Sequence, residues 1–252
     1  GSEQAPEHEP LHAVETRSVD AQAGEGEWNL PFRFTNQVER CDATHASVML
    51  SAMSSDTAVD VAITIVVGYL VGSIPIANMV AARRAKIDLR TTGDRNPGFW
   101  NARETLGKRA AIPVFVGDVS KGAVAALVGV ALANPGVWGL AYVGTGAAMM
   151  GHAFPVFARF RGGRSILTFA GGAAVYATLP FSVTIALLLA VFGVTRSFAR
   201  AAQVGFFAFP LVQLVIQGPY RTAATGVLMT FIGLRFAMAA LADRSDRGAA
   251  QP

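Results

Sequence analysis

The segment GHAFPVFARFRGGRS, residues 151–165, contains one histidine, three arginines and three glycines. Arginine side chains bind anions, and glycine lets backbone N–H groups approach a ligand closely. Two other segments have a similar character: GSIP at residues 72–75 and GDRNPGFWN at residues 93–101. Together the three segments predict a pocket for ligands that carry phosphate.

Polar side chains in these segments are the candidates for contact with such a ligand. Asn96 and Asn101 carry amides that can donate to phosphate oxygens, and Gly93 and Gly98 shape the turn between them. Ser73 places a hydroxyl in an apolar stretch, just before a proline. Irregular backbone at membrane depth is tolerated only against protein or a wet cavity. Helix packing through the small residues of GSIP is an equally good explanation of its glycine.

Three ionisable residues lie within or at the ends of apolar stretches. Asp118 and Lys121 are three residues apart, so on a helix they share one face and can pair. A structural ion pair and a substrate-binding lysine explain Lys121 equally well. His152 is the only histidine beyond residue 57, and it is either a hydrogen-bonded anchor or a catalytic group. With no second histidine or cysteine near it, we expect no metal site and no cofactor.

The composition shows what kind of protein must position these residues. The chain has 252 residues, of which 52% are apolar and only 15% are charged, and its mean hydropathy is +0.40. These values are those of an integral membrane protein and not of a soluble domain.

A helix needs about 20 apolar residues to cross a membrane. By this criterion the sequence predicts an all-α, polytopic fold with seven transmembrane helices. The expected spans are 58–82, 110–133, 135–151, 165–179, 180–195, 201–217 and 222–242, with a break at Leu179–Pro180. Arginine and lysine concentrate in cytoplasmic loops. Seven spans place the basic segments 83–109, 152–164 and 196–200 on one side, so we predict the N-terminus outside and the C-terminus inside.

Charge divides the chain near residue 57. Residues 1–57 carry ten acidic and three basic side chains, whereas the remainder carries seven acidic and eighteen basic ones. We predict a polar, acidic arm without a packed core at 1–57, a membrane domain at 58–242 and a short cytoplasmic tail at 243–252. If the natural chain starts at Met49 or Met53, the arm is not part of the working protein.

The motifs resemble those of the bacterial glycerol-3-phosphate acyltransferases that use acyl phosphate, the PlsY type. The matching segments, in order, are GYLVGSIPIANMVA, IDLRTTGDRNPGFWNARETLG, DVSKG and GHAFPVFARFRGGRSILT. The resemblance implies transfer of a fatty acyl group from acyl phosphate to the 1-hydroxyl of glycerol 3-phosphate, giving lysophosphatidic acid and phosphate. It also implies a place in the bacterial cytoplasmic (inner) membrane, among membrane lipid, with the site facing the cytoplasm. Neither a nucleic-acid partner nor an oligomeric state is implied.

The resemblance assigns roles to particular residues. Ser73, Asn96 and His152 become the expected catalytic residues. The expected substrate-binding residues are Arg90, Gly93, Gly98, Asn101, Lys121, Gly162, Gly163 and Arg164.

Several positions depart from the family pattern. Asp94 and Arg95 stand where the family has small residues, Glu104 replaces an arginine, and Arg164 replaces a lysine. Phe236 follows an arginine where the family has histidine. Two alternatives therefore stay open: an inactive homologue that binds anionic lipid or a partner protein, and a transporter with an anion site.

Overall fold

The computed structural model describes residues 55–133 and 138–249, and regular secondary structure in these ranges is entirely helical. The helices are α2 (Ser55–Gly72), α3 (Ile76–Ala85), α4 (Phe99–Leu106), α5 (Lys108–Leu132), α6 (Gly139–Ala153), the 3-10 turn η1 (Val156–Ala158), α7 (Ile166–Tyr176), α8 (Thr178–Thr195), α9 (Phe198–Gln217) and α10 (Pro219–Ala249). The predicted all-α class is confirmed. The predicted arm lies outside the described residues apart from residues 55–57.

Each of the seven predicted apolar segments coincides largely with helix in the structure. Five helical segments are long and apolar enough to cross a membrane: Thr57–Ala85, Lys108–Leu132, Thr178–Thr195, Phe198–Gln217 and Pro219–Ala242. Helices α6 and α7 have 15 and 11 residues, fewer than the roughly 20 that a full crossing needs. The number of crossings and the orientation therefore remain predictions.

Proline fixes the two breaks in the apolar stretches. The first stretch is interrupted between α2 and α3 at Ser73–Pro75, where the proline has no N–H to continue the helix. The second break lies at Ala177, not at the predicted Leu179–Pro180. Pro180 sits in the first turn of α8, where its missing N–H is not needed, so the chain bends before it.

The centre of the membrane domain is packed through glycine. Helix α2 lies against α6, and α5 lies against both α6 and α7. A Cβ atom added to Gly72 would overlap the carbonyl of Ala148 on α6, and one added to Gly122 would overlap the carbonyl of Thr168 on α7. Small residues let helix backbones approach closely where lipid gives no hydrophobic drive. The backbones of these four helices are therefore closely packed, with no room for a side chain at the glycine contacts.

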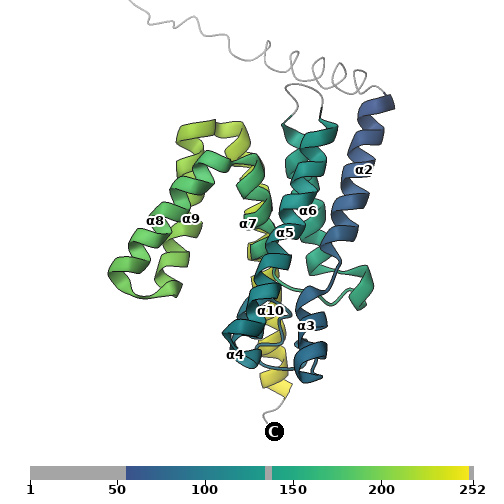
Figure 1. The fold of residues 1–252 in the computed structure, drawn as a ribbon, viewed down its shortest axis with the longest axis vertical. Coiled ribbons are helices and arrows are strands. Elements are labelled where there is room, and N and C mark those ends of the chain that lie inside the picture. The colour runs from purple at the N-terminus through teal and green to yellow at the C-terminus, as the bar shows by residue number, and fades with distance from the viewer. Residues whose placement is uncertain (1–54, 134–137, 250–252) are drawn as a thin grey trace, which may run out of the picture. The chain divides into compact units, whose positions relative to one another are not determined.

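Helices α8 and α9 form a hairpin, and α9 also packs against α10 (Figure 1). Aromatic rings join the hairpin to the central helices. Phe209 on α9 meets Phe169 on α7 and Phe181 on α8 edge to face, with ring centroids 5.9 and 6.3 Å apart.

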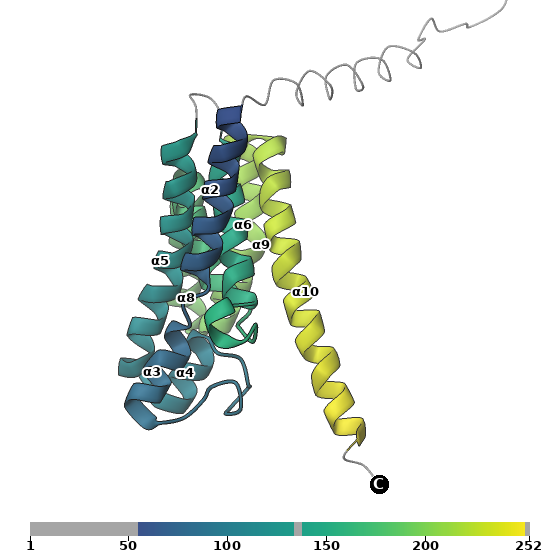
Figure 2. The same cartoon turned by 90° about the vertical axis from the view of Figure 1, so that its right-hand side faces the viewer.

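The connections alternate between the two ends of the helical domain. Those after α2, α6 and α8 lie toward the end where α3, α4 and the last turns of α10 project (Figures 1 and 2). The connections that follow α7 and α9 lie at the opposite end. All three segments that predict anion binding are thus brought to one end.

Candidate active site

A buried charged triad lies between α5 and α6. Lys121 Nζ is 2.9 Å from Asp118 Oδ1 on the same face of α5, as the three-residue spacing predicts. His152, in the last turn of α6, places Nδ1 3.5 Å from both Asp118 Oδ1 and Lys121 Nζ. All three side chains are at most 8% exposed. Buried charges are costly unless paired, so the three groups hold one another in place.

The triad lines a narrow cavity with about 20 Å³ of free volume, enough for one water-sized group. Its other walls come from the break after α2 and from the glycines of the RGGRS segment, Gly162 and Gly163. Asp118 and His152 also line the larger aromatic cavity described below, whereas Lys121 lines the narrow cavity alone among the cavities described.

The two RGGRS glycines hold the loop on α6 through their backbones. The N–H of Gly163 donates to the His152 carbonyl at 3.0 Å, and that of Gly162 donates to the Ala153 carbonyl at 3.1 Å. A Cβ on either glycine would overlap atoms of His152. These N–H groups are therefore engaged with protein, and what the glycines provide is close approach of the loop to the histidine.

Asn101 is the centre of the loop that precedes α4. Its side chain is fully buried and donates to the carbonyls of Leu89 and Thr92 at 3.0 and 2.8 Å, while its Oδ1 accepts from Thr105. Gly93 has a φ of +63°, and a side chain there would strike the Asn101 amide. The structure thus gives these two residues a loop-forming position, not one that faces a described cavity.

Ser73 is likewise turned inward. It is fully buried, and its hydroxyl donates to the carbonyl of Tyr69 at 2.8 Å, one turn earlier in α2. Its neighbour Gly72 lines the narrow cavity, whereas Ser73 itself does not.

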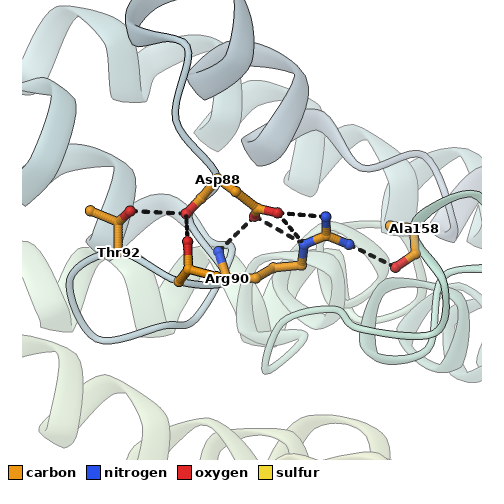
Figure 3. Close-up of polar contacts among 5 residues, drawn as sticks. Asp88, Arg90, Thr92 and Ala158 are labelled. Carbon is orange, nitrogen blue, oxygen red and sulfur yellow. Dashed lines mark hydrogen bonds and ion pairs between the residues drawn. The ribbon is translucent and has the colours of Figure 1, made fainter.

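Arg90 joins the loop that precedes α4 to the loop that follows α6, as Figure 3 shows. Its guanidinium donates to both carboxylate oxygens of Asp88 and, at 3.0 Å, to the carbonyl of Ala158 in the loop after α6. It lines a surface pocket of about 290 Å³ with Arg159 and Arg161, away from His152. The structure therefore does not bring Arg90 together with the triad.

Hydrogen bonds from Arg90 lower the pKa of Asp88 below its usual range, outweighing the opposite effect of partial burial. A lowered folded-state pKa means that the pair stabilises the protein fully above about pH 4 and loses this contribution as the pH falls through the lowered value.

We expect Asp88→Asn to lower the thermal midpoint by about 2 °C at neutral pH, because exposed pairs contribute little. The difference from the unsubstituted protein should shrink as the pH falls toward 3. Thermal unfolding in detergent across this pH range measures it, and a difference independent of pH would refute the electrostatic explanation.

Two larger cavities adjoin the triad. The aromatic cavity, of about 410 Å³, has walls that include Phe99, Trp100, Phe115, Phe198 and Phe236, and it reaches Asp118 and His152. Trp100 on α4 stacks on Phe198 at the start of α9, with centroids 6.1 Å apart. This cavity suits an apolar chain whose end lies near the triad.

The basic cavity, of about 370 Å³, is lined by Arg95, Arg164 and Arg235, with Asp94 as its acidic residue. Asn96 and Arg164 line both the basic and the aromatic cavity. Of the other predicted site residues, His152 lines the aromatic cavity and Gly162 lines the basic one. Gly98 also lines the aromatic cavity.

Two supporting residues were not among the predicted site residues. Arg235 on α10 donates to the carbonyls of Gly162 and Gly163 at 3.3 to 3.4 Å and lies over the ring of Phe154. Tyr69 donates to the Phe154 carbonyl at 2.8 Å. An arginine inside an apolar span was a usable signal for Arg235. Nothing in the sequence pointed to Tyr69.

Comparison with known proteins identifies the family of this chain. A family model described as "Glycerol-3-phosphate acyltransferase" matches residues 62–242. A relative from Dehalococcoides mccartyi, "Glycerol-3-phosphate acyltransferase 5", is 37% identical over 172 residues, covering 66% of this chain and 72% of the relative. One from Bacillus velezensis, "Glycerol-3-phosphate acyltransferase", is 33% identical and covers 68% of this chain and 88% of its own length.

Solved structures share the fold. The crystal structure of PlsY (YgiH), an integral membrane glycerol 3-phosphate acyltransferase, in its glycerol 3-phosphate form, superposes with a TM-score of 0.63 at 26% identity. The lysophosphatidic acid form gives 0.60 at 25% identity. Each comparison covers 74% of this chain and 93% of the solved one.

Proposed function

This chain belongs to the glycerol-3-phosphate acyltransferase family. On that basis we propose that it transfers a fatty acyl group from acyl phosphate to the 1-hydroxyl of glycerol 3-phosphate. The products are lysophosphatidic acid and inorganic phosphate. The observation that carries the proposal is the junction of two cavities. An aromatic cavity for an apolar chain meets a basic cavity for phosphate at Asn96 and Arg164, beside the buried triad.

The chemistry needs no covalent enzyme intermediate. The hydroxyl oxygen attacks the carbonyl carbon, an oxyanion forms, and the bond from that carbon to the phosphate oxygen breaks. The leaving phosphate takes the electron pair of that bond and accepts the hydroxyl proton. Positive charge from Lys121 and donors such as the Asn96 amide stabilise the negative charge that develops.

Catalytic roles for Ser73, Asn96 and His152 remain part of the proposal, with different support. Asn96 and His152 both line the aromatic cavity. Ser73 lines none of the described cavities and its hydroxyl donates to the Tyr69 carbonyl, so we propose that it is a positioning residue at the break after α2.

We place the protein in the bacterial cytoplasmic membrane with the N-terminus outside and the C-terminus inside. The segment 83–109, which runs from α3 to the start of α5, and the connections after α6 and α8 carry most of the basic side chains of the membrane domain, and they lie toward one end of it. Basic loops stay in the cytoplasm. The site would therefore meet glycerol 3-phosphate from the cytoplasm and the acyl chain from the bilayer.

The direct test is phosphate release by the purified protein from a long-chain acyl phosphate, with and without glycerol 3-phosphate. Release that requires the acceptor, with lysophosphatidic acid formed in equal amount, supports the proposal. A folded protein that binds the substrates without turnover would instead be the inactive homologue, and movement of substrate across vesicles without turnover would indicate a transporter.

Asn96→Ala is expected to lower kcat/KM for acyl transfer about tenfold, because a hydrogen bond to a charged group is lost. The matched control is Gln203→Ala, which removes an exposed amide on α9 outside the cavities described. Steady-state kinetics of both variants measure the effect. Equal activity of both variants would remove Asn96 from the site.

A further inference from the structure

Two residues that depart from the family pattern contact a third such residue, Arg164. Asp94 lies in the loop before α4, Arg164 lies two residues before α7 and Phe236 lies on α10. Arg164 Nη1 is 3.4 Å from Asp94 Oδ2, and the Arg164 guanidinium lies over the Phe236 ring at 4.7 Å from its centroid. Residues that are 72 and 70 positions from Arg164 along the chain thus converge on its side chain.

The trio lies at the boundary between the two large cavities. Asp94 and Arg164 line both of them, and Phe236 lines the aromatic one. Among the residues that line the aromatic cavity, Arg164 is the one arginine or lysine side chain. An anionic head group on an apolar chain held in that cavity therefore meets Arg164, and it meets the Asp94 carboxylate at the same place.

The contact between Asp94 and Arg164 leaves donor capacity on the guanidinium. Charge-assisted N–H···O bonds are usually 2.7–2.9 Å long, so 3.4 Å is a loose contact. The two side chains are 33% and 24% exposed, and ion pairs of that exposure are weak. Arg164 Nε is buried and has no hydrogen-bond partner within the described part of the chain. A phosphate can thus displace the carboxylate and bind the guanidinium with more donors.

We propose that Asp94 competes with substrate and product phosphate for Arg164. Its carboxylate lowers the affinity of this guanidinium for phosphate, which favours departure of the inorganic phosphate that the reaction releases. The identity of the anion rests on the proposed function, whereas the competition rests on the contacts described.

The direction in which one substitution changes the affinity for phosphate tests the competition. Asp94→Asn removes the charge and keeps an Oδ1 that can accept from the Asn96 N–H, as Asp94 Oδ1 does at 3.1 Å. If Asp94 competes with phosphate, this variant binds phosphate more tightly. If Asp94 instead orients Arg164 for the substrate, the variant binds phosphate more weakly.

The experiment measures the dissociation constants of inorganic phosphate and of hexadecyl phosphonate, a non-reacting anionic amphiphile, by calorimetry in detergent. We expect Asp94→Asn to bind both about fivefold more tightly, with a smaller gain in high salt. The control is Glu104→Gln, which removes an acid that is exposed on α4 and outside the cavities described, and it should change either constant less than about twofold. Unchanged or weaker binding by Asp94→Asn, or an equal gain in Glu104→Gln, overturns the proposal.

The same substitution in an Arg164→Ala protein tests whether the gain in affinity depends on Arg164. There, Asp94→Asn should no longer strengthen binding of either probe, and a persisting fivefold gain would show that Arg164 is not the group concerned. Inhibition of acyl transfer by inorganic phosphate should likewise strengthen in Asp94→Asn. Absence of turnover in the unsubstituted protein would count against the proposed function alone, because the binding measurements need no catalysis.

Discussion

Replacement of Lys121 by methionine should lower kcat/KM for acyl transfer at least about a hundredfold, the effect of removing one preorganised positive donor. It should also destabilise the folded protein by about 3 kcal/mol, because buried Asp118 would lose its lysine partner and have only His152 beside it. Methionine matches the length of the lysine stem, so packing is nearly retained. Initial rates and thermal unfolding of the purified variant in detergent measure the two effects.

The double variant Asp118→Asn with Lys121→Met distinguishes the effect of the unpaired carboxylate on stability from the effect of the lost lysine charge on activity. It leaves no unpaired carboxylate, so it should regain more than half of the lost stability. Its activity should stay as low as that of Lys121→Met, because the positive charge is still missing. A double variant as unstable as the single one would show that lost packing, and not the unpaired carboxylate, causes the loss of stability. Recovery of activity would remove Lys121 from the mechanism.

The second large effect is expected at Gly122. A methyl group there would overlap the Thr168 carbonyl of α7 and approach the N–H of Gly172, and both are backbone that cannot rotate away. Gly122→Ala should therefore force α5 and α7 apart and destabilise the protein by at least about 3 kcal/mol. The triad residue Lys121 is its direct neighbour, so acyl transfer should fall with stability.

Gly226→Ala on α10 is the matched control. It makes the same change in a helix where no atom lies within 4 Å of the added carbon. Helix propensity then predicts a neutral effect or a gain of up to about 1 kcal/mol. Comparison of the two thermal unfolding curves measures the difference. Similar losses in both variants would contradict the account of helix packing through glycine.

Most of the fold could be predicted from the sequence, because apolar length and loop charge are strong signals in a membrane protein. They predicted the seven apolar helical segments and placed the anion-binding segments at one end, whereas α4 lies in a segment that the sequence analysis treats as a loop. The break at Ala177 was misplaced by a few residues. Apolar content is continuous there, and only the rule that proline fits the first turn of a helix decides where the chain bends.

Less of the site could be predicted from the sequence, because a residue type does not reveal which group it will contact. The sequence predicts that Gly162 and Gly163 bind an anion through their backbone, yet their N–H groups donate to carbonyls of α6. It predicts that Asn101 binds phosphate, yet the Asn101 amide is hydrogen-bonded to three groups around its own loop. The contact between Arg164 and Phe236 joins segments far apart in sequence, which no local pattern encodes.

The glycine contacts of the central helices have a consequence for how this site can diverge. The positions of the triad atoms are set by backbone meeting backbone at places such as Gly72 and Gly122, not by the side chains of the loops. The loops can therefore exchange residues such as Asp94 and Arg164 without moving the triad. Substitutions in the loops can therefore change ligand preference while the helices that hold the triad keep their positions.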